Sequence, residues 1–212
     1  MTIFDLVLIL AVLGCVVALF LLGYFLLRRQ WRRAKRILLA LGSFLVVYTV
    51  LLLSVSLLSP QRVLAMHQDR CFDDWCLSVE RVVPQSTVGN APMVVTAHGT
   101  FYLVTVHVSS RARGITQRAL DAQVYLLDAS NQRYDPDASG QQAIDATGQD
   151  GQPLDSKVGP GGSFTRTVVF DLPRGSSHLA LVVTHGQFPG VLIIADEQSF
   201  LHKPTIFQLQ MP

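Results

Sequence analysis

The chain has 212 residues, of which half are hydrophobic, and a formal net charge of +2. Six of its 17 basic residues lie between positions 28 and 36, whereas the residues after Leu58 include 11 basic and 14 acidic side chains. The larger part of the chain is therefore acidic. This argues against a nucleic-acid-binding domain, because such domains contact phosphates through a basic surface.

Two uncharged apolar segments predict a pair of transmembrane helices. Residues 6–27 and 37–58 each contain 22 residues without a charge. A helix rises about 1.5 Å per residue, so each segment spans about 33 Å, enough for a hydrocarbon core of about 30 Å. In lipid the backbone must satisfy its own hydrogen bonds, which favours helices at about 4–27 and 37–58.

The basic segment 28–36 predicts how this hairpin is oriented. Short connections rich in arginine and lysine stay on the cytoplasmic side of a membrane. The N-terminus and the C-terminal domain then lie on the extracytoplasmic side of a bacterial inner membrane. A cleaved signal peptide is the alternative, but no basic residue precedes the first apolar segment and arginines follow it. We expect topology and lipid headgroup contacts at Arg28, Arg29, Trp31, Arg32, Arg33, Lys35 and Arg36.

Residues 60–74 read as a stalk that ends in a cysteine turn. Cys71 and Cys76 are separated by four residues, and a disulfide between them needs the chain to fold back, which Asp73 and Asp74 favour. An extracytoplasmic compartment would keep such a bond oxidised. We expect a structural disulfide. A thiol-redox role is the alternative, although the two aspartates oppose thiolate formation.

Residues 75–212 predict an all-β domain. The apolar pattern changes from continuous to alternating, and short strands with turn signals between them are typical of a two-sheet, immunoglobulin-like sandwich. We expect strands at residues 75–83, 101–109, 123–128, 133–134, 164–171, 179–184, 191–194 and 205–209.

Residues 135–162 are rich in Asp, Gly, Gln, Ser and Pro and predict a long acidic loop, with one short strand near residues 143–144. The start of this loop matches the first positions of a calcium-binding EF-hand loop, but Ala146 stands where a bidentate glutamate is needed. A looser calcium site, and with it calcium-dependent adhesion, is the alternative to a solvated loop. Its candidate ligands are Asp135, Asp137, Asp145 and Asp150.

Four motifs make the chain similar to a known family. Residues 102–108 read YLVTVHV, 125–134 read YLLDASNQRY, 158–164 read VGPGGSF and 168–173 read VVFDLP. In this order they resemble, over residues 75–183, the telokin-like, immunoglobulin-type domain of the DUF4352 family of bacterial membrane-anchored and lipid-anchored proteins. One departure is the sequence Ser109, Ser110, Arg111, where asparagine is usual. The resemblance implies an extracytoplasmic β-sandwich with no established enzymatic activity, and it transfers no catalytic residue.

Two similar histidine motifs stand at predicted strand ends. Residues 98–101 read HGTF and residues 185–188 read HGQF. One interpretation brings both histidines together at one edge of the sandwich. The simpler interpretation is that each histidine occupies a turn beside a glycine that the turn requires.

Binding or assembly, without catalysis, is the function that these observations favour. The sequence holds no nucleophile elbow, phosphate loop or dinucleotide fingerprint, and we expect no cofactor. The expected partners are the lipid bilayer and another envelope or membrane protein, with Phe188 and Phe200 as candidate contacts. The alternative is an accessory subunit of a larger membrane complex, in which Gly14, Gly23 and Gly42 pack against foreign helices.

Overall fold

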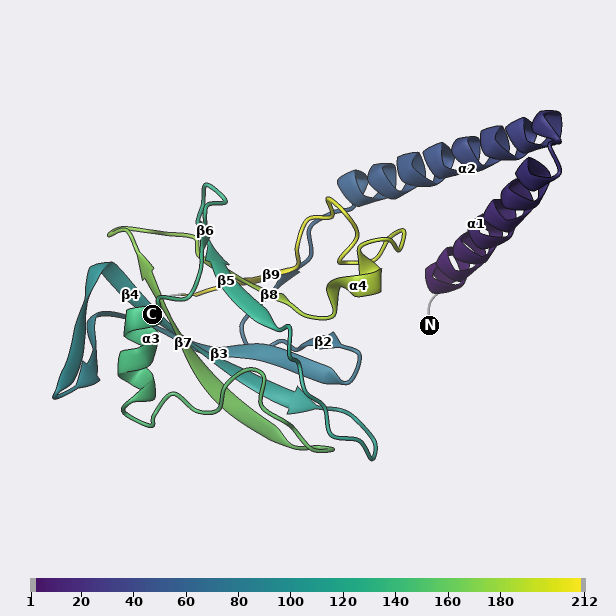
Figure 1. The fold of residues 1–212 in the computed structure, drawn as a ribbon. Coiled ribbons are helices and arrows are strands. Elements are labelled where there is room, and N and C mark those ends of the chain that lie inside the picture. The colour runs from purple at the N-terminus through teal and green to yellow at the C-terminus, as the bar shows by residue number, and fades with distance from the viewer. Residues whose placement is uncertain (1–2, 211–212) are drawn as a thin grey trace. The chain divides into compact units, whose positions relative to one another are not determined.

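The computed structural model describes residues 3–210, which form two compact units (Figure 1). The helical unit contains the residues up to Gln61 together with Gln187–Pro204. The sandwich unit contains Arg62–Gly186 together with the residues from Thr205 onward. Each unit is described by itself below.

The helical unit is built on two helices, α1 (Ile3–Leu27) and α2 (Trp31–Leu58). Both are long and apolar enough to cross a membrane. Their apolar side chains are mostly exposed, as expected for helices whose surface faces lipid rather than a protein core. The two predicted helices are therefore confirmed as helices, and together they fit a membrane anchor.

The predicted basic loop at residues 28–36 is wrong in its extent. Only the residues from Arg28 to Gln30 connect the helices, and α2 begins at Trp31, so most of the basic segment is its first turns. Arginine, lysine and alanine are good helix formers, so the helix extends through the charged residues. Charge therefore marks the edge of the apolar segment but not the end of the helix.

The sandwich unit contains two sheets, in agreement with the predicted fold class. The five-stranded sheet has the order β1-β9-β8-β5-β6, and the four-stranded sheet has the order β2-β3-β4-β7. All strand pairs are antiparallel except β1 with β9, which are parallel. The strands are β1 (Val63–Leu64), β2 (Arg70–Phe72), β3 (Trp75–Asn90), β4 (Met93–Ser110), β5 (Gln123–Leu127), β6 (Arg133–Tyr134), β7 (Ser163–Leu172), β8 (Ala180–Thr184) and β9 (Ile206–Gln208).

The core lies between the sheets and follows from strand alternation. Along β4, Val104, Val106 and Val108 are buried, while the residues between them are half-buried on the opposite face. Phe170 from β7 and Phe207 from β9 belong to the same core cluster. The four-stranded sheet thus presents one face to the core and its other face to the surroundings of the sandwich.

From Arg62 onward, the predicted stalk at residues 60–74 belongs to the sandwich instead. Strand β1 pairs with β9, and β2 pairs with β3, so both sheets recruit residues from this region. Short edge strands of two or three residues carry too little alternation to be recognised from sequence. The linker between α2 and the first strand is consequently short.

The acidic loop at residues 135–162 also differs from the prediction, because it contains helix α3 (Ala138–Asp145) where a strand was expected near residues 143–144. The side chain of Asp137 caps the helix by accepting a hydrogen bond from the backbone N–H of Gly140 (2.6 Å). Ala143 is fully buried and packs in a second, smaller cluster on the outer face of the four-stranded sheet. A Cβ on Gly140 would lie 2.8 Å from Val169, so this glycine permits the close approach of α3 to β7.

Residues 187–204 were expected to belong to the β domain but group with the helical unit. The strand predicted at residues 191–194 is wrong, because this region forms turns. Two backbone hydrogen bonds close the first turns, from the N–H of Leu192 to Pro189 and from the N–H of Ile193 to Gly190. Proline and glycine in adjacent positions favour turns over a strand, whatever the apolar residues that follow.

Candidate functional site

A polar cleft lies on the outer face of the four-stranded sheet, beside the C-terminal end of α3. Its volume is about 340 Å³. One wall is the far part of the β3–β4 hairpin, whose register shifts between Gln85 and Thr87. The polar residues that line the cleft are Arg81, Gln85, Thr87, Asn90, Thr105, Thr147, Gln149 and Thr167.

A β-bulge directs Arg81 into this cleft. Val79 pairs with Val106 and Arg81 pairs with Thr105, which leaves Glu80 as an extra residue in β3. Without the extra residue, strict alternation would place Arg81 on the same face as the buried Val79. The bulge therefore turns the guanidinium to the outer face, where Thr105 and Thr167 lie side by side with their hydroxyl oxygens 3.2 Å apart.

Arg81 supplies the charge of the cleft. It is the one charged residue among those that line it, and within the described residues it forms no ion pair. The other polar groups are neutral amides and hydroxyls, which donate and accept hydrogen bonds without competing for the guanidinium. This set of groups suits an acidic or polar ligand better than a metal ion. Sequence analysis missed Arg81, and the adjacent charges of Glu80 and Arg81 inside an alternating strand were the available signal of the bulge.

The far part of the β3–β4 hairpin is held against α3 by a close backbone approach. Gly89 has a φ of +90°, and a Cβ there would lie 2.1 Å from the carbonyl oxygen of Met93 and 3.0 Å from the Cβ of Ala143. Only glycine fits both requirements. The wall of the cleft is thus positioned by packing and does not depend on a ligand.

The four aspartates considered as calcium ligands have other partners. Asp135 pairs with Arg133 (2.6 Å), and Asp137 caps α3. Asp145 and Asp150 both pair with Arg166, which is only 9% exposed; the Asp145 contact is 2.9 Å long. In the part of the chain that the structure describes, no group of three His, Cys, Asp or Glu residues is arranged to hold a metal ion.

The two carboxyl groups that pair with Arg166 have pKa values shifted in opposite directions. Burial raises the pKa of Asp150, and its proximity to Asp145 adds to this rise. Burial also acts to raise the pKa of Asp145, but hydrogen bonds, among them that from Gln141, and the charge of Arg166 outweigh burial and hold it below its usual value. The cluster ties the end of α3 and the loop after it to β7, which is a structural role.

The predicted disulfide is confirmed, because Cys71 and Cys76 are bonded. The two residues are direct partners in the β2–β3 register, so a tight turn at the intervening residues brings them together. Cys76 is completely buried, and the adjacent Trp75 packs against Phe72 with ring centroids 6.0 Å apart. The bond is part of a packed corner of the sandwich.

Arg70 links this corner of the sandwich to the five-stranded sheet. Its guanidinium donates hydrogen bonds to the carbonyl oxygens of Val183 (2.7 Å) and Thr205 (3.2 Å) and lies 4.6 Å from the ring centroid of Phe72. The disulfide thus sits where β2 is fixed to the five-stranded sheet.

The two histidine motifs do not come together. His98 lies near the start of β4 and contacts Asp171 of β7 (3.2 Å). His185 pairs with Asp121 and packs on Trp75, with ring centroids 5.3 Å apart, and Trp75 pairs with Ser110 at the other end of β4. The shared-edge interpretation therefore disagrees with the structure. The turn interpretation holds for His185, which follows β8 beside Gly186 (φ +65°), but not for His98, which lies with Gly99 inside β4.

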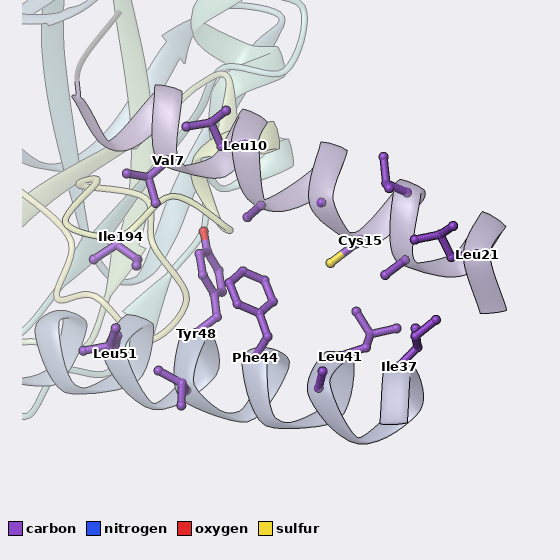
Figure 2. Close-up of a pocket in the computed structure, with 16 residues that line it drawn as sticks. Val7, Leu10, Cys15, Leu21, Ile37, Leu41, Phe44, Tyr48, Leu51 and Ile194 are labelled. Carbon is purple, nitrogen blue, oxygen red and sulfur yellow. The ribbon is translucent and has the colours of Figure 1, made fainter. Parts of the chain in front are cut away.

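The helical unit contains an apolar groove of about 690 Å³ between α1 and α2 (Figure 2). Cys15 and Leu21 of α1 face this groove opposite Leu41, Phe44 and Tyr48 of α2. The described part of the chain has one free cysteine, Cys15, and its surroundings are hydrocarbon side chains. This position suits a small apolar packing residue.

Phe188 and Phe200, the candidate partner contacts, lie in the helical unit and not in the sandwich. Phe188 is 78% exposed and Phe200 is 54% exposed. The basic residues and Trp31 lie around the connection between α1 and α2, and Trp31 is also exposed. The chain therefore separates apolar and basic contact residues in one unit from the polar cleft in the other.

Comparisons with known proteins give solved structures at low sequence identity and one family match. Solved structures with likeness to the chain include a conserved hypothetical protein from Bacillus anthracis (16% identity, 57% of this chain and 89% of that chain, TM-score 0.45). An uncharacterized β-sandwich protein from Clostridium difficile is 8% identical (72% and 96% of the two chains, TM-score 0.43). The secreted protein MPT63 from Mycobacterium tuberculosis is 12% identical (71% and 99%, TM-score 0.45). A search of curated proteins gave no match.

The family comparison covers more than half of the chain. Residues 71–190 match the family described as a domain of unknown function, DUF4352. The match begins at the first cysteine of the disulfide and includes every strand from β3 to β8. The protein therefore belongs to the DUF4352 family.

Proposed function

We propose that this protein is a two-pass membrane protein that holds its DUF4352 sandwich on the extracytoplasmic side of a bacterial inner membrane, where the sandwich binds another component without catalysis. The Cys71–Cys76 disulfide carries this proposal, because such bonds persist in oxidising compartments and are rare in the cytosol. The basic connection between α1 and α2 supports the same orientation independently, since it favours the cytoplasmic side. With α2 across the bilayer, the sandwich and the connection lie on opposite sides.

The residues at the connection are suited to a headgroup layer. Arg28 lies 5.5 Å from the ring centroid of Tyr24, and Arg33 lies 5.7 Å from that of Phe25. Aromatic rings and basic side chains at a helix end form an interfacial anchor, with the charges directed to anionic lipids. This supports lipid contact as the role of the basic segment.

Labelling of introduced cysteines tests the orientation. In a Cys15→Ala background, Ala129→Cys at the exposed β5–β6 turn is expected to react with a membrane-impermeant maleimide in intact spheroplasts. Gln30→Cys at the helix connection is expected to react only after permeabilisation. The native Cys71 and Cys76 do not interfere, because they are bonded to each other. The reverse pattern of labelling would reject the proposed orientation.

We propose that the sandwich binds its partner through the polar cleft that contains Arg81. Its single positive charge and its neutral hydroxyl and amide groups suit an acidic, polar group of a partner protein, in the way that arginine commonly recognises carboxylates. The bulge that exposes Arg81 supports this assignment, because bulges frequently re-aim side chains at functional sites.

Photocrosslinking in native membranes tests the cleft. A benzophenone amino acid at Gln85 is expected to capture a partner protein, and the Arg81→Gln substitution is expected to abolish that product by removing the charge. The same crosslinker at Ala129, on the other sheet, is the matched control. Products at Ala129 that equal those at Gln85, or products that persist with Arg81→Gln, would show that the cleft does not bind the partner.

The apolar groove between α1 and α2 supports a second candidate function, that of an accessory subunit in a membrane complex. The groove has room for large side chains, and Gly14 of α1 lines it. Small residues allow close packing of transmembrane helices. In this version the hairpin contacts the partner within the bilayer and the sandwich contributes a further contact outside it.

A further inference from the structure

The segment Gln187–Pro204 is compact although it lacks regular structure beyond the single turn α4 (Gln187–Gly190). Several of its backbone N–H groups donate hydrogen bonds within the segment. The N–H of Phe200 donates to the carbonyl of Val191 (3.0 Å), and the N–H of His202 donates to that of Ser199 (2.9 Å). The buried hydroxyl of Ser199 donates to the carbonyl of Ile193. The groups that are bonded in this way lose little when water is removed from around them.

The segment exposes four large apolar side chains, and Lys203 near its end is exposed as well. Phe200 is 54% exposed, Leu201 56% and Leu192 44%, and Phe188 is more exposed still. Large apolar side chains that cluster on one exposed segment indicate an interaction surface. The carboxylate of Asp196 is turned into the segment, where it accepts a hydrogen bond from the N–H of Gln198 (2.8 Å).

Two hydrogen bonds at different positions along the chain, one within α2 and one just after it, hold the segment. At the end of the helix, the side-chain amide of Gln61 donates to the carbonyl of Pro204 (3.0 Å). Within the helix, the hydroxyl of Tyr48 donates to the carbonyl of Leu192 (2.7 Å). Tyr48 precedes Leu58 by ten residues, which corresponds to about 15 Å along the helix axis. Ile194 lies beside Tyr48 and Leu51 at the open end of the groove (Figure 2).

We propose that Gln187–Pro204 is a third membrane-contacting element, a re-entrant segment that enters the extracytoplasmic leaflet and places Phe188, Phe200 and Leu201 among lipid chains. Irregular backbone is tolerated at membrane depth only where its polar groups are satisfied by protein. The internal turns and the Tyr48 hydroxyl meet this condition for the groups that they bond. We assign lipid as the occupant of the apolar surface, because the segment belongs to the same compact unit as the exposed apolar faces of α1 and α2 and its Ile194 lines the groove between them.

This inference rests on the proposed placement of α2 across the bilayer, and quenching by brominated lipids tests both separately. The full chain, with Trp31→Phe, is reconstituted in vesicles that contain brominated acyl chains. One further tryptophan is introduced at a time, as Phe200→Trp or Phe188→Trp. The positive control is Phe44→Trp within α2. The negative control is Val94→Trp, an exposed apolar position in the sandwich.

We expect Phe200→Trp and Phe188→Trp to be quenched to the same extent as Phe44→Trp, with Val94→Trp unaffected. If Phe44→Trp is quenched and the two loop positions are not, the re-entrant segment is rejected while the membrane anchor stands, and the loop faces water or protein. Quenching at Val94→Trp as strong as at the loop positions also overturns the inference, because lipid contact would then not be specific to the segment. Failure at Phe44→Trp would reject the membrane anchor itself.

Discussion

Replacing Arg166 with methionine is expected to lower the free energy of unfolding of the sandwich by about 3–5 kcal/mol. The substitution leaves the buried carboxylate of Asp150 without its partner, and Asp145 loses its 2.9 Å contact. An unpaired charge in a low-dielectric interior is strongly unfavourable, whereas methionine retains much of the volume of the arginine stem. The measurement is denaturant unfolding of the full chain with Trp31→Phe. The fluorescence of the remaining native tryptophan, the buried Trp75, then reports on the sandwich alone.

Arg118 is the matched control for this substitution. It pairs with Asp155 at 2.9 Å, but both side chains are nearly half exposed, so Arg118→Met is expected to change stability by about 0–1 kcal/mol. If Arg166→Met prevents folding, the double variant Arg166→Met, Asp150→Leu removes the buried charge along with its partner and is expected to recover folding. Equal effects of Arg166→Met and Arg118→Met would show that the buried cluster is not what holds α3 to the sheet.

This cluster shows what sequence analysis missed. Asp145 and Asp150 lie 21 and 16 residues before Arg166, and their position in a polar segment favoured a solvated or calcium-binding loop. Arg166 stands in a strand that reads as a simple alternation. The pairing depends on how α3 packs on the sheet. Because α3 buries only a few side chains, its sequence lacks the apolar period from which a helix is predicted. Long-range charge pairing leaves no local pattern from which it can be predicted.

The features that were predicted correctly carry their signal locally. Each apolar segment satisfies the membrane length requirement by itself, and β4 alternates between buried and half-buried residues from Tyr102 to Ser110. The disulfide joins residues that are five positions apart, so only a tight turn had to be inferred. Arg81 lies between these cases: its strand was predicted, but the bulge that changes its face was not.

The segment Gln187–Pro204 was misassigned because its composition is ambiguous. Residues 191–194 are apolar, as in a buried strand, but they lie in turns of the helical unit. Sequence patterns report that apolar residues avoid water, and they do not report whether a protein core or lipid provides the apolar environment. The hydrogen bond between Tyr48 and Leu192, which are 144 residues apart, shows that this segment packs against α2 and does not belong to the core of the sandwich.

The second large effect is expected from the basic connection. Replacing Arg28, Arg29, Arg32, Arg33, Lys35 and Arg36 with glutamine, together with Ile3→Lys and Asp5→Lys, moves the positive charge from the connection to the N-terminus. Because arginine and lysine near helix ends set the orientation of short connections, we expect a large fraction of the chains to insert with the sandwich in the cytoplasm. Labelling of Ala129→Cys in intact spheroplasts should fall accordingly. Replacing the five arginines with lysine preserves the charge and should leave labelling unchanged.

Inversion of the hairpin should also change the state of the sandwich. Cytosolic thiols are kept reduced, so Cys71 and Cys76 are expected to react with an alkylating reagent without prior reduction in the inverted chains, and to resist it in the native orientation. The chain-entropy model gives about 2 kcal/mol for the loss of a bond that closes so short a loop. The inverted sandwich should therefore unfold at a lower denaturant concentration. If the glutamine variant keeps both its labelling and its bond, the basic residues do not set the orientation, and the disulfide alone would support an extracytoplasmic sandwich.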